Sequence, residues 1–289
     1  RSTPSNSSAA SDVYKRQILT RFAKGAIDDV RIYSRVLDPC EISELAGTRV
    51  GLVAHLDFED SGYLGKDVSG CENDGNVNGG PVWTSPGIIG NGSLTFDGAD
   101  DTIDFPFSDA LNINFEEDFS WSAWIDTTNG GPVIAWSRPC YRNKRPSTLC
   151  LYVNSSGYLV LESADVGSLV STQTVTDGPH HVAITCEADT GVPPGDDGWD
   201  TVTMYIDAAP DGLKDDWEIQ EPPAASPQIK IGCSSSNFPT DAPLKFDGQI
   251  DDVRIYKRCL SQTDVEDIYN QTETCCSVDV GGGGGEIRP

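Results

Sequence analysis

Hydrophobic and polar residues alternate in short runs along most of the chain, and Gly, Pro, Asn and Asp separate the runs. For example, Phe119, Trp121 and Ala123 alternate with Ser120 and Ser122. A period of two is that of a β-strand with one buried face. Many evenly spaced strands of this kind predict an all-β fold, built as a two-sheet antiparallel sandwich. The predicted strands are 52–58, 93–96, 119–125, 149–153, 158–162, 181–186, 202–206, 228–231 and 250–256.

One stretch of the chain occurs twice. Residues 25–37 and 248–260 are identical at ten of thirteen positions. Each copy is followed by residues typical of a helix start, which are Asp38 and Pro39 after the first copy and Ser261 after the second. Each copy therefore predicts a strand, a turn and a short helix at the end of a structural unit.

The repeat divides the chain into segments. We expect residues 48–271 to form a complete domain that ends in a short C-terminal helix, and residues 18–47 to be the C-terminal fragment of a preceding domain of the same kind. Residues 272–289 contain a run of glycines and have the composition of a flexible linker. Residues 1–17 are polar and Ser-rich and resemble the in-frame translation of a sequencing adapter, so we expect them to be non-native.

The charge of the chain excludes one class of partner. Asp and Glu number 45 against 20 Lys and Arg, which leaves a formal net charge of −25 and a sequence pI near 4.2. Nucleic acid is itself densely negative, so we expect no nucleic-acid partner. No apolar run approaches the roughly 18 residues of a membrane-spanning helix, so we expect no membrane span.

Nine cysteines indicate disulfide bonds, and with them an extracellular or cell-surface location. Cys140 and Cys150 bracket a loop between two predicted strands, a spacing that suits a disulfide-closed loop. Cys186 and Cys233 each end a predicted strand and form a second candidate pair. Structural zinc is the rival interpretation, but the chain has no Cys-x-x-Cys pair.

Several sequence blocks, in order over nearly all of residues 48–271, carry a family resemblance. They lie at 52–58, 67–70, 73–75, 81–83, 90–98, 100–101, 119–125, 180–183, 204–207, 231–232 and 246–256. In these blocks the chain resembles the laminin G-like jelly-roll domains of the concanavalin A-like lectin and glucanase superfamily. The resemblance implies two curved antiparallel sheets, rim loops available to ligands, and often a structural calcium ion. The chain departs from the family at Pro179, where Trp is usual, and in the long acidic insert 188–200.

Asp251 is the candidate residue for this structural calcium. It shares strand parity with Ile255, so we expect its carboxylate to point into an apolar face, where an unpaired charge is costly. One interpretation makes Asp251 a ligand or close neighbour of Ca²⁺, with oxygens around Asp57, Phe58 and Gly98 completing the site. The alternative is a buried, hydrogen-bonded Asp without a metal.

A second acidic element has the spacing of an EF-hand calcium loop. Asp207, Asp211, Asp215 and Glu218 match the first, fifth, ninth and twelfth positions of such a loop. Ala209 occupies the third position, where a ligand is required, and the segment follows a predicted strand rather than a helix. The sequence therefore favours a polar hairpin over a second calcium loop.

Candidate catalytic groups are few. Glucanases of the superfamily carry carboxylates at alternating positions of one strand, and Asp57 and Glu59 have this spacing. They fall on the first predicted strand of the domain, however, and the chain has no Glu-x-Asp-x-x-Glu run. Adjacent His180 and His181 point to opposite faces of a strand and cannot chelate a metal together, and His55 stands alone. We therefore expect the chain not to be an enzyme.

Trp199, in the acidic insert, is the tryptophan least like a core residue, and it is a candidate platform for a sugar ring. The sequence thus predicts a non-catalytic extracellular module for binding or adhesion, with glycan or protein ligands. Two alternatives stay open: an accessory domain of a larger secreted carbohydrate-active enzyme, and a structural spacer in a repeat-containing surface protein. Specificity in such folds lies in variable loops on a fixed scaffold, so the ligand stays open as well.

Overall fold

The structure is a computed structural model of the 289-residue chain. It describes residues 30–37, 51–108, 110–112, 117–137, 148–163, 167–188, 200–217, 228–234 and 241–271. The chain divides into two compact units, Arg1–Leu37 and Asp38–Pro289. Within the described ranges, all strands and the helix belong to the second unit.

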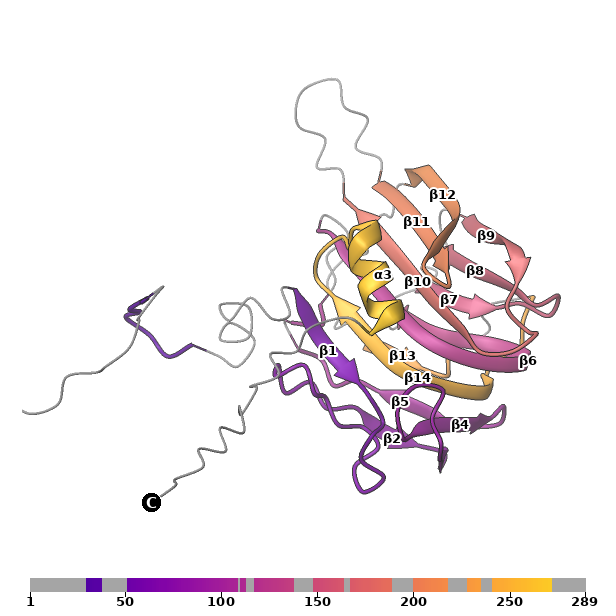
Figure 1. The fold of residues 1–289 in the computed structure, drawn as a ribbon, viewed down its shortest axis with the longest axis horizontal. Helices are drawn as coiled ribbons and strands as arrows, with labels where there is room; N and C mark the ends of the chain where they lie inside the picture. Colours follow the sequence, from indigo (N-terminus) through magenta and orange to yellow (C-terminus); the bar gives the residue numbers. More distant parts are fainter. Residues whose placement is uncertain are drawn as a thin grey trace, which may run out of the picture. The chain divides into compact units, whose positions relative to one another are not determined.

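The described part of the second unit is a 14-stranded sheet followed by one helix (Figure 1). All strand pairs are antiparallel, so the predicted all-β class is confirmed. The strands are β1 (Leu52–Leu56), β2 (Asn76–Asn78), β3 (Val82–Thr84), β4 (Ser93–Asp97), β5 (Thr102–Asp104), β6 (Phe119–Ser137), β7 (Thr148–Val153), β8 (Tyr158–Ser163), β9 (Gly167–Thr174), β10 (His180–Glu187), β11 (Asp200–Ile206), β12 (Ala209–Trp217), β13 (Gln228–Ile231) and β14 (Asp247–Tyr256). Each predicted strand overlaps one of these.

Strand β6 connects two ladders of strands. Its first part pairs with β10 and β14, and its last part pairs with β7 and β13. Between the two parts lie Gly130 and Gly131, with positive φ of 78° and 114°. A Cβ on Gly131 would come within 2.3 Å of the Lys245 carbonyl oxygen, so only glycine fits this bend. Because β6 belongs to both ladders, hydrogen bonds join all strands into one sheet, and the predicted separation into two sheets is not confirmed.

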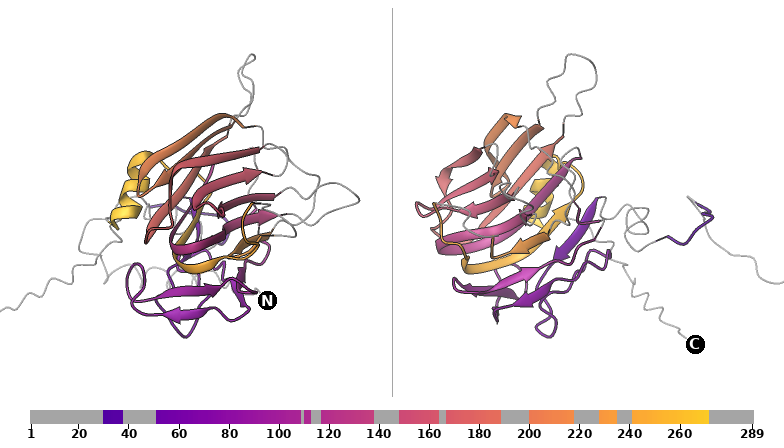
Figure 2. Two further views of the ribbon diagram at one scale, coloured as in Figure 1. Left: turned by 90° about the vertical axis from the view of Figure 1, so that its right-hand side faces the viewer. Right: turned by 180° about the vertical axis from the view of Figure 1, so that it is seen from behind.

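Both ladders bury side chains in one hydrophobic core. Trp121 and Ile255 come from the first ladder, Trp136 and Leu151 from the second, and all four are fully buried in the same cluster. Figure 2 shows the two ladders from further sides. Burial of this many large apolar side chains, at roughly 1.5–3 kcal/mol each, is the main contribution to stability.

The two copies of the repeated stretch differ in structure. The second copy contributes most of β14, which pairs with β1, β4 and β6. Residues 30–37 of the first copy form no strand, although their sequence is almost the same. Ile32 is 93% exposed, whereas its counterpart Ile255 is fully buried. A strand needs sheet partners, and the same side chains do not form one without them.

The helix α3 (Gln262–Asn270) begins at the predicted position. The Ser261 hydroxyl accepts a hydrogen bond from the Asp264 N–H, and the Asp264 carboxylate accepts one from the Ser261 N–H, which is a capping box. Arg258 holds the same carboxylate at 2.9 and 3.0 Å. Val265 and Ile268 pack on a second apolar cluster drawn from β1, β10, β11 and β14, so α3 covers this face of the sheet (Figure 1). Among the described residues, no helix has the length and apolarity to cross a membrane.

Candidate functional site

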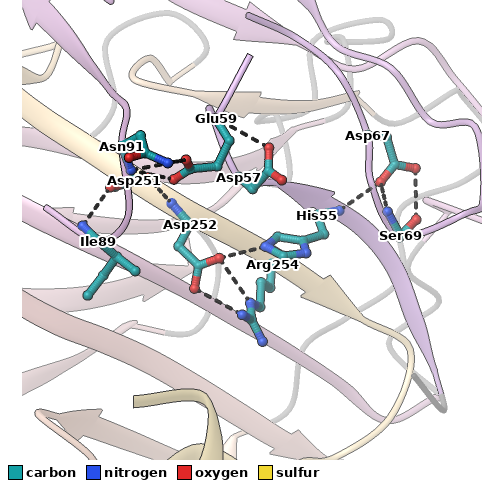
Figure 3. A network of polar contacts seen from close by, with 10 residues as sticks. All are labelled: His55, Asp57, Glu59, Asp67, Ser69, Ile89, Asn91, Asp251, Asp252 and Arg254. Atoms are coloured by element: carbon teal, nitrogen blue, oxygen red, sulfur yellow. Dashed lines mark hydrogen bonds and ion pairs between the residues drawn. The ribbon is translucent and has the colours of Figure 1, made fainter. Parts of the chain in front are cut away.

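Asp251 and Asp252 are adjacent on β14, yet their carboxylates have different surroundings (Figure 3). Asp252 has a positive φ of 47°, and the register of β14 against β6 shifts between Asp251 and Arg254. This irregularity is a β-bulge, which changes the direction of the side chains beside it. Both residues are buried, with 1% and 5% of their surface exposed.

Asp252 lies between two basic side chains. The His55 Nε2 is 2.5 Å from one carboxylate oxygen, and Arg254 lies 3.3 and 3.2 Å from the two oxygens (Figure 3). Burial by itself raises the pKa of Asp252, but the His55 hydrogen bond and the Arg254 charge outweigh it and hold the pKa at about 2. The buried carboxylate is therefore ionised at neutral pH. His55, isolated in the sequence, is thus a buried hydrogen-bond partner of Asp252.

Asp251 has backbone N–H groups and another acid as neighbours. Its two oxygens accept hydrogen bonds from the N–H groups of Ile89 (2.9 Å) and Asp252 (2.8 Å). Burial raises the pKa of Asp251 to about 7, with the nearby charges of Asp252 and Glu59 adding to the shift. Glu59 in turn holds the loop by accepting from the backbone and side chain of Asn91 at 2.9–3.0 Å (Figure 3).

Asp67 attaches the loop between β1 and β2, residues 57–75, to β1. Its carboxylate accepts hydrogen bonds from the N–H groups of His55, Ser69 and Asn73 at 2.8–2.9 Å and from the Ser69 hydroxyl. The Asn73 side chain donates to the Val53 carbonyl at 2.7 Å. One buried acid thus fixes the start of the loop beside His55, and the Asp-x-Ser spacing was its sequence signal.

The four residues of the predicted calcium site lie just after β1 (Asp57 and Phe58), just after β4 (Gly98) and on β14 (Asp251). Asp57 is near Glu59, whose N–H it accepts, and the Phe58 carbonyl accepts from the Trp83 Nε1 at 2.8 Å. Gly98 donates to the Phe246 carbonyl instead, because antiparallel pairing sets the end of β4 opposite the start of β14. Asp251 lies further along β14, beside Ile89. A calcium ion held by these residues therefore stays a prediction.

Gly98 belongs to an acidic turn between β4 and β5. Ligand oxygens of Asp97, Asp100 and Asp101 lie within 4.8 Å of one another. The oxygens also serve the turn itself, since Asp101 accepts from the Asp97 N–H and Asp97 from the Ala99 N–H. Burial, followed by the neighbouring Asp charges, raises the pKa of Asp101. The turn is a structural element of acidic side chains.

The second acidic element is a β-hairpin, as the sequence favoured. Asp207 lies in the β11–β12 turn and accepts from the His181 N–H at 2.9 Å. Asp211 lies on β12, and its carboxylate accepts from the backbone of Thr172 and Gln173 on β9. Asp215 is exposed further along β12, and Glu218 lies outside the described residues, as does Trp199. Asp211 therefore joins two neighbouring strands rather than lining a calcium loop.

His180 and His181 face opposite sides of β10, as predicted. His180 is held between Asp177 and Asp207, each at 2.8 Å. The ring of His181 is buried against Trp124 and Tyr269, at centroid distances of 5.5 and 6.0 Å. Burial lowers the pKa of His181 to about 4, so the ring is neutral. In the described part of the chain, neither of its nitrogens has a hydrogen-bond partner.

The predicted disulfide pairs need correction. Cys150, Cys186 and Cys233 are free thiols, and Cys140 lies outside the described residues. Cys186 pairs with the start of β6 at Phe119, whereas β13, before Cys233, pairs with its far end. The two cysteines therefore belong to opposite ends of one long strand and cannot bond. Cys71, which was not in a predicted pair, is disulfide-bonded.

A tyrosine and two carboxylates meet on the second ladder, where the sequence predicted no site. The Tyr152 hydroxyl lies 2.8 Å from a Glu162 oxygen and 2.7 Å from an Asp241 oxygen. Tyr152 and Glu162 come from β7 and β8, and Asp241 from the segment before β14. Burial, then the two acids, raises the pKa of Tyr152, so its hydroxyl stays protonated. The register of β7 and β8 puts Tyr152 and Glu162 on one face, which strand parity could have indicated. Asp241 is 89 residues from the tyrosine, and no local sequence pattern indicates the contact.

Comparison with known proteins identifies the family. No curated protein sequence matches the chain. Domain 4 of AbnA, a GH43 extracellular arabinanase from Geobacillus stearothermophilus, in complex with arabinotriose, is similar with a TM-score of 0.56 and 18% identity over 75% of this chain and 98% of that one. The binding domain of Paraclostridial Mosquitocidal Protein 1 has a TM-score of 0.54 and 17% identity over 78% and 53% of the two chains.

A Trypanosoma rangeli sialidase in complex with 2,3-difluorosialic acid has a TM-score of 0.51 and 16% identity. The match covers 78% of this chain and 33% of the sialidase chain, so this chain corresponds to a third of that protein. At these identities the likeness shows the fold. The family model described as the concanavalin A-like lectin/glucanases superfamily matches residues 97–266, and the chain therefore belongs to that superfamily.

Proposed function

We propose that the chain is a non-catalytic, extracellular module that binds glycans. The observation that carries the proposal is the likeness to the arabinanase domain, because that domain has the same fold, is matched over 98% of its length and is in complex with arabinotriose. The concanavalin A-like fold is also a scaffold on which loops and faces vary while the sheet stays fixed. Protein ligands are the alternative within the same binding role.

The surroundings of Asp57 and Glu59 support a role without catalysis. Both oxygens of Glu59 accept from Asn91, and Asp57 accepts from the Glu59 N–H. A glycosidase needs two carboxyl groups that face each other across a substrate, roughly 5–9.5 Å apart. These two are engaged with their own loop instead.

Two further observations keep rival roles in view. The similar structures include a domain of an arabinanase and a sialidase chain, which favours an accessory domain of a larger carbohydrate-active enzyme. The repeated stretch at 25–37 and 248–260 favours a spacer in a repeat-containing surface protein. If the chain by itself binds a glycan, the result supports the binding module and the accessory domain, and it contradicts a role as a spacer only.

The test is binding of the full chain to an array of neutral, amino and acidic oligosaccharides, once with calcium and once with chelator. Binding to one glycan class supports the proposal, and release of reducing sugar from a bound glycan contradicts the non-catalytic role. A calcium ion stays part of the proposal on the family resemblance alone. Equal binding and equal thermal stability with calcium and chelator would remove it.

A further inference from the structure

One face of the second ladder is turned away from the core. Register pairs Tyr152 with Val160 and Val160 with Val170, so these three side chains share a face. Cys150 and Glu162 are paired on the same face. The residues that alternate with them along these strands, such as Leu151 and Leu161, lie in the hydrophobic core. The face is therefore the one away from that core. Cys150, Tyr152 and Val160 are buried on it in a separate small cluster, whereas Val170 is 45% exposed.

Two hydrogen-bond contacts on this face have only one proton between them. Tyr152 has one hydroxyl proton, but two carboxylates lie within hydrogen-bond distance of its oxygen. The hydroxyl can donate its proton to only one of the carboxylates. The other carboxylate then faces the phenol oxygen, so that two acceptors meet without a proton between them. Tyr63, elsewhere on the surface, is the contrasting case, because its hydroxyl donates to Asp74 at 2.7 Å and has no second acceptor among the described residues.

Asp241 is held at the face by the main chain. Its carbonyl accepts from the Ser155 N–H at 3.0 Å, so the segment is attached to the β7–β8 connection. Ser234 supplies a second polar group. It is 6% exposed, its hydroxyl has no partner in the described residues, and it lies against the Cys150 thiol, which also neighbours Glu162. Two acceptors without enough donors and a buried hydroxyl without a partner both call for a ligand that donates hydrogen bonds.

We propose that Glu162, Tyr152 and Asp241 form the glycan-binding point of the module and accept hydrogen bonds from the hydroxyl or amino groups of a neutral or amino sugar. The inference rests on the proposed function and deepens it. Sugars present several O–H donors beside apolar C–H surface, which matches the half-buried Glu162 and the exposed Asp241 on the same face as the exposed Val170. Two carboxylates on a chain of net charge −25 repel sialylated or sulfated glycans.

The experiment compares four probes on the full chain: arabinotriose, a neutral N-acetylglucosamine oligomer, a cationic glucosamine oligomer, and heparin. We expect binding of a neutral or amino probe and none of heparin. Asp241→Asn and Glu162→Gln should each weaken that binding by about tenfold or more, because each converts one acceptor oxygen into an amide donor. Tyr63→Phe is the matched control for Tyr152→Phe, since both remove a phenol hydroxyl bonded to an acid, and the control should leave binding unchanged.

The outcomes separate the two proposals. If a glycan binds and neither Asp241→Asn nor Glu162→Gln weakens it, the site is wrong and the glycan-binding function stands. Preference for heparin also overturns the site. If none of the four probes binds and a broader glycan array shows no binding either, both proposals fail. Asp241 is exposed, so Asp241→Asn leaves the core intact, and unchanged thermal unfolding of that variant shows that lost binding is not lost folding.

Discussion

Asp251 and Asp252 are chemically identical, adjacent and buried, yet their pKa values are displaced in opposite directions, to about 7 and about 2. The side of β14 under α3 surrounds Asp252 with His55 and Arg254. The side toward the rim surrounds Asp251 with backbone N–H groups and the acid Glu59. Burial raises both pKa values, so the difference lies in the neighbours. A buried acid stays ionised where a cation lies beside it.

The largest expected effect comes from removing that cation. Arg254→Met leaves Asp252 buried with His55 alone, and we expect a loss of about 3–5 kcal/mol in the free energy of unfolding. Chemical denaturation at pH 7 measures it. Arg254→Lys keeps the charge and should cost less. A loss of under 1 kcal/mol, as at an exposed pair, would show that Arg254 does not decide the state of Asp252.

The next largest effect on stability is expected from the buried imidazole of His181, which lies near Asp252 and Arg254. Because the folded-state pKa of His181 is lowered from 6.5 to about 4, the unfolded chain binds a proton first. Stability should therefore fall by about 3 kcal/mol as pH drops from 6.5 to 4. The charged groups that face His181 are Asp252, Arg254 and Asp207. Thermal unfolding against pH measures the fall, and His181→Phe, which keeps the ring packing, should flatten it. An unchanged slope in that variant would assign the fall to other groups.

At Asp251, on the side of β14 toward the loop at Ile89, stability depends on pH with the opposite sign. The folded-state pKa of Asp251 is raised, so this acid destabilises the protein as pH rises from about 4 through about 7. Asp251→Asn should raise stability at pH 8 by about 2 kcal/mol, because the amide is neutral but loses one of the two backbone hydrogen bonds that the carboxylate accepts. Unfolding at pH 5 and pH 8 is the measurement. Glu59→Gln removes a neighbouring charge and should give a smaller gain of the same sign. If Asp251→Asn is less stable than the parent at pH 8, a cation balances this acid.

The smallest effect tests whether helix α3 covers only the side of β14 that carries Asp252. Ser261→Ala removes the hydroxyl of the α3 capping box and should cost about 1 kcal/mol. Hydrogen exchange should rise in α3 and not in the loop at Ile89, because α3 packs on one side of β14 only. Ser261→Asp retains a capping oxygen and is the control. Equal exchange changes on both sides would show that the two sides are not separate.

Periodicity predicted most of the sheet because burial imposes a period of two on each strand. It predicted β14 and placed His180 and His181 on opposite faces, whereas the capping residue Ser261 predicted the start of α3. It missed the three-residue strands β2, β3 and β5, which are too short to show a period. It also missed β9 and β12, whose sequences are rich in polar residues. It also missed the partner of His55, which is 197 residues away. A pattern reports which face a side chain occupies, whereas a pair across strands depends on registers and on the bulge at Asp252, which have no local signature.

Strand β14 is the last strand of the sheet, and it pairs with β1, near the start of the domain. Leu52 faces Tyr256, so some two hundred residues must be synthesised before this pairing can form. On a ribosome, strands made earlier wait with unpaired edges and exposed apolar faces until β14 emerges. Folding of this domain is thus completed after synthesis of its C-terminal end and is slow by the measure of contact order. A chain that stops before residue 247 lacks the strand to which β1 and β4 pair.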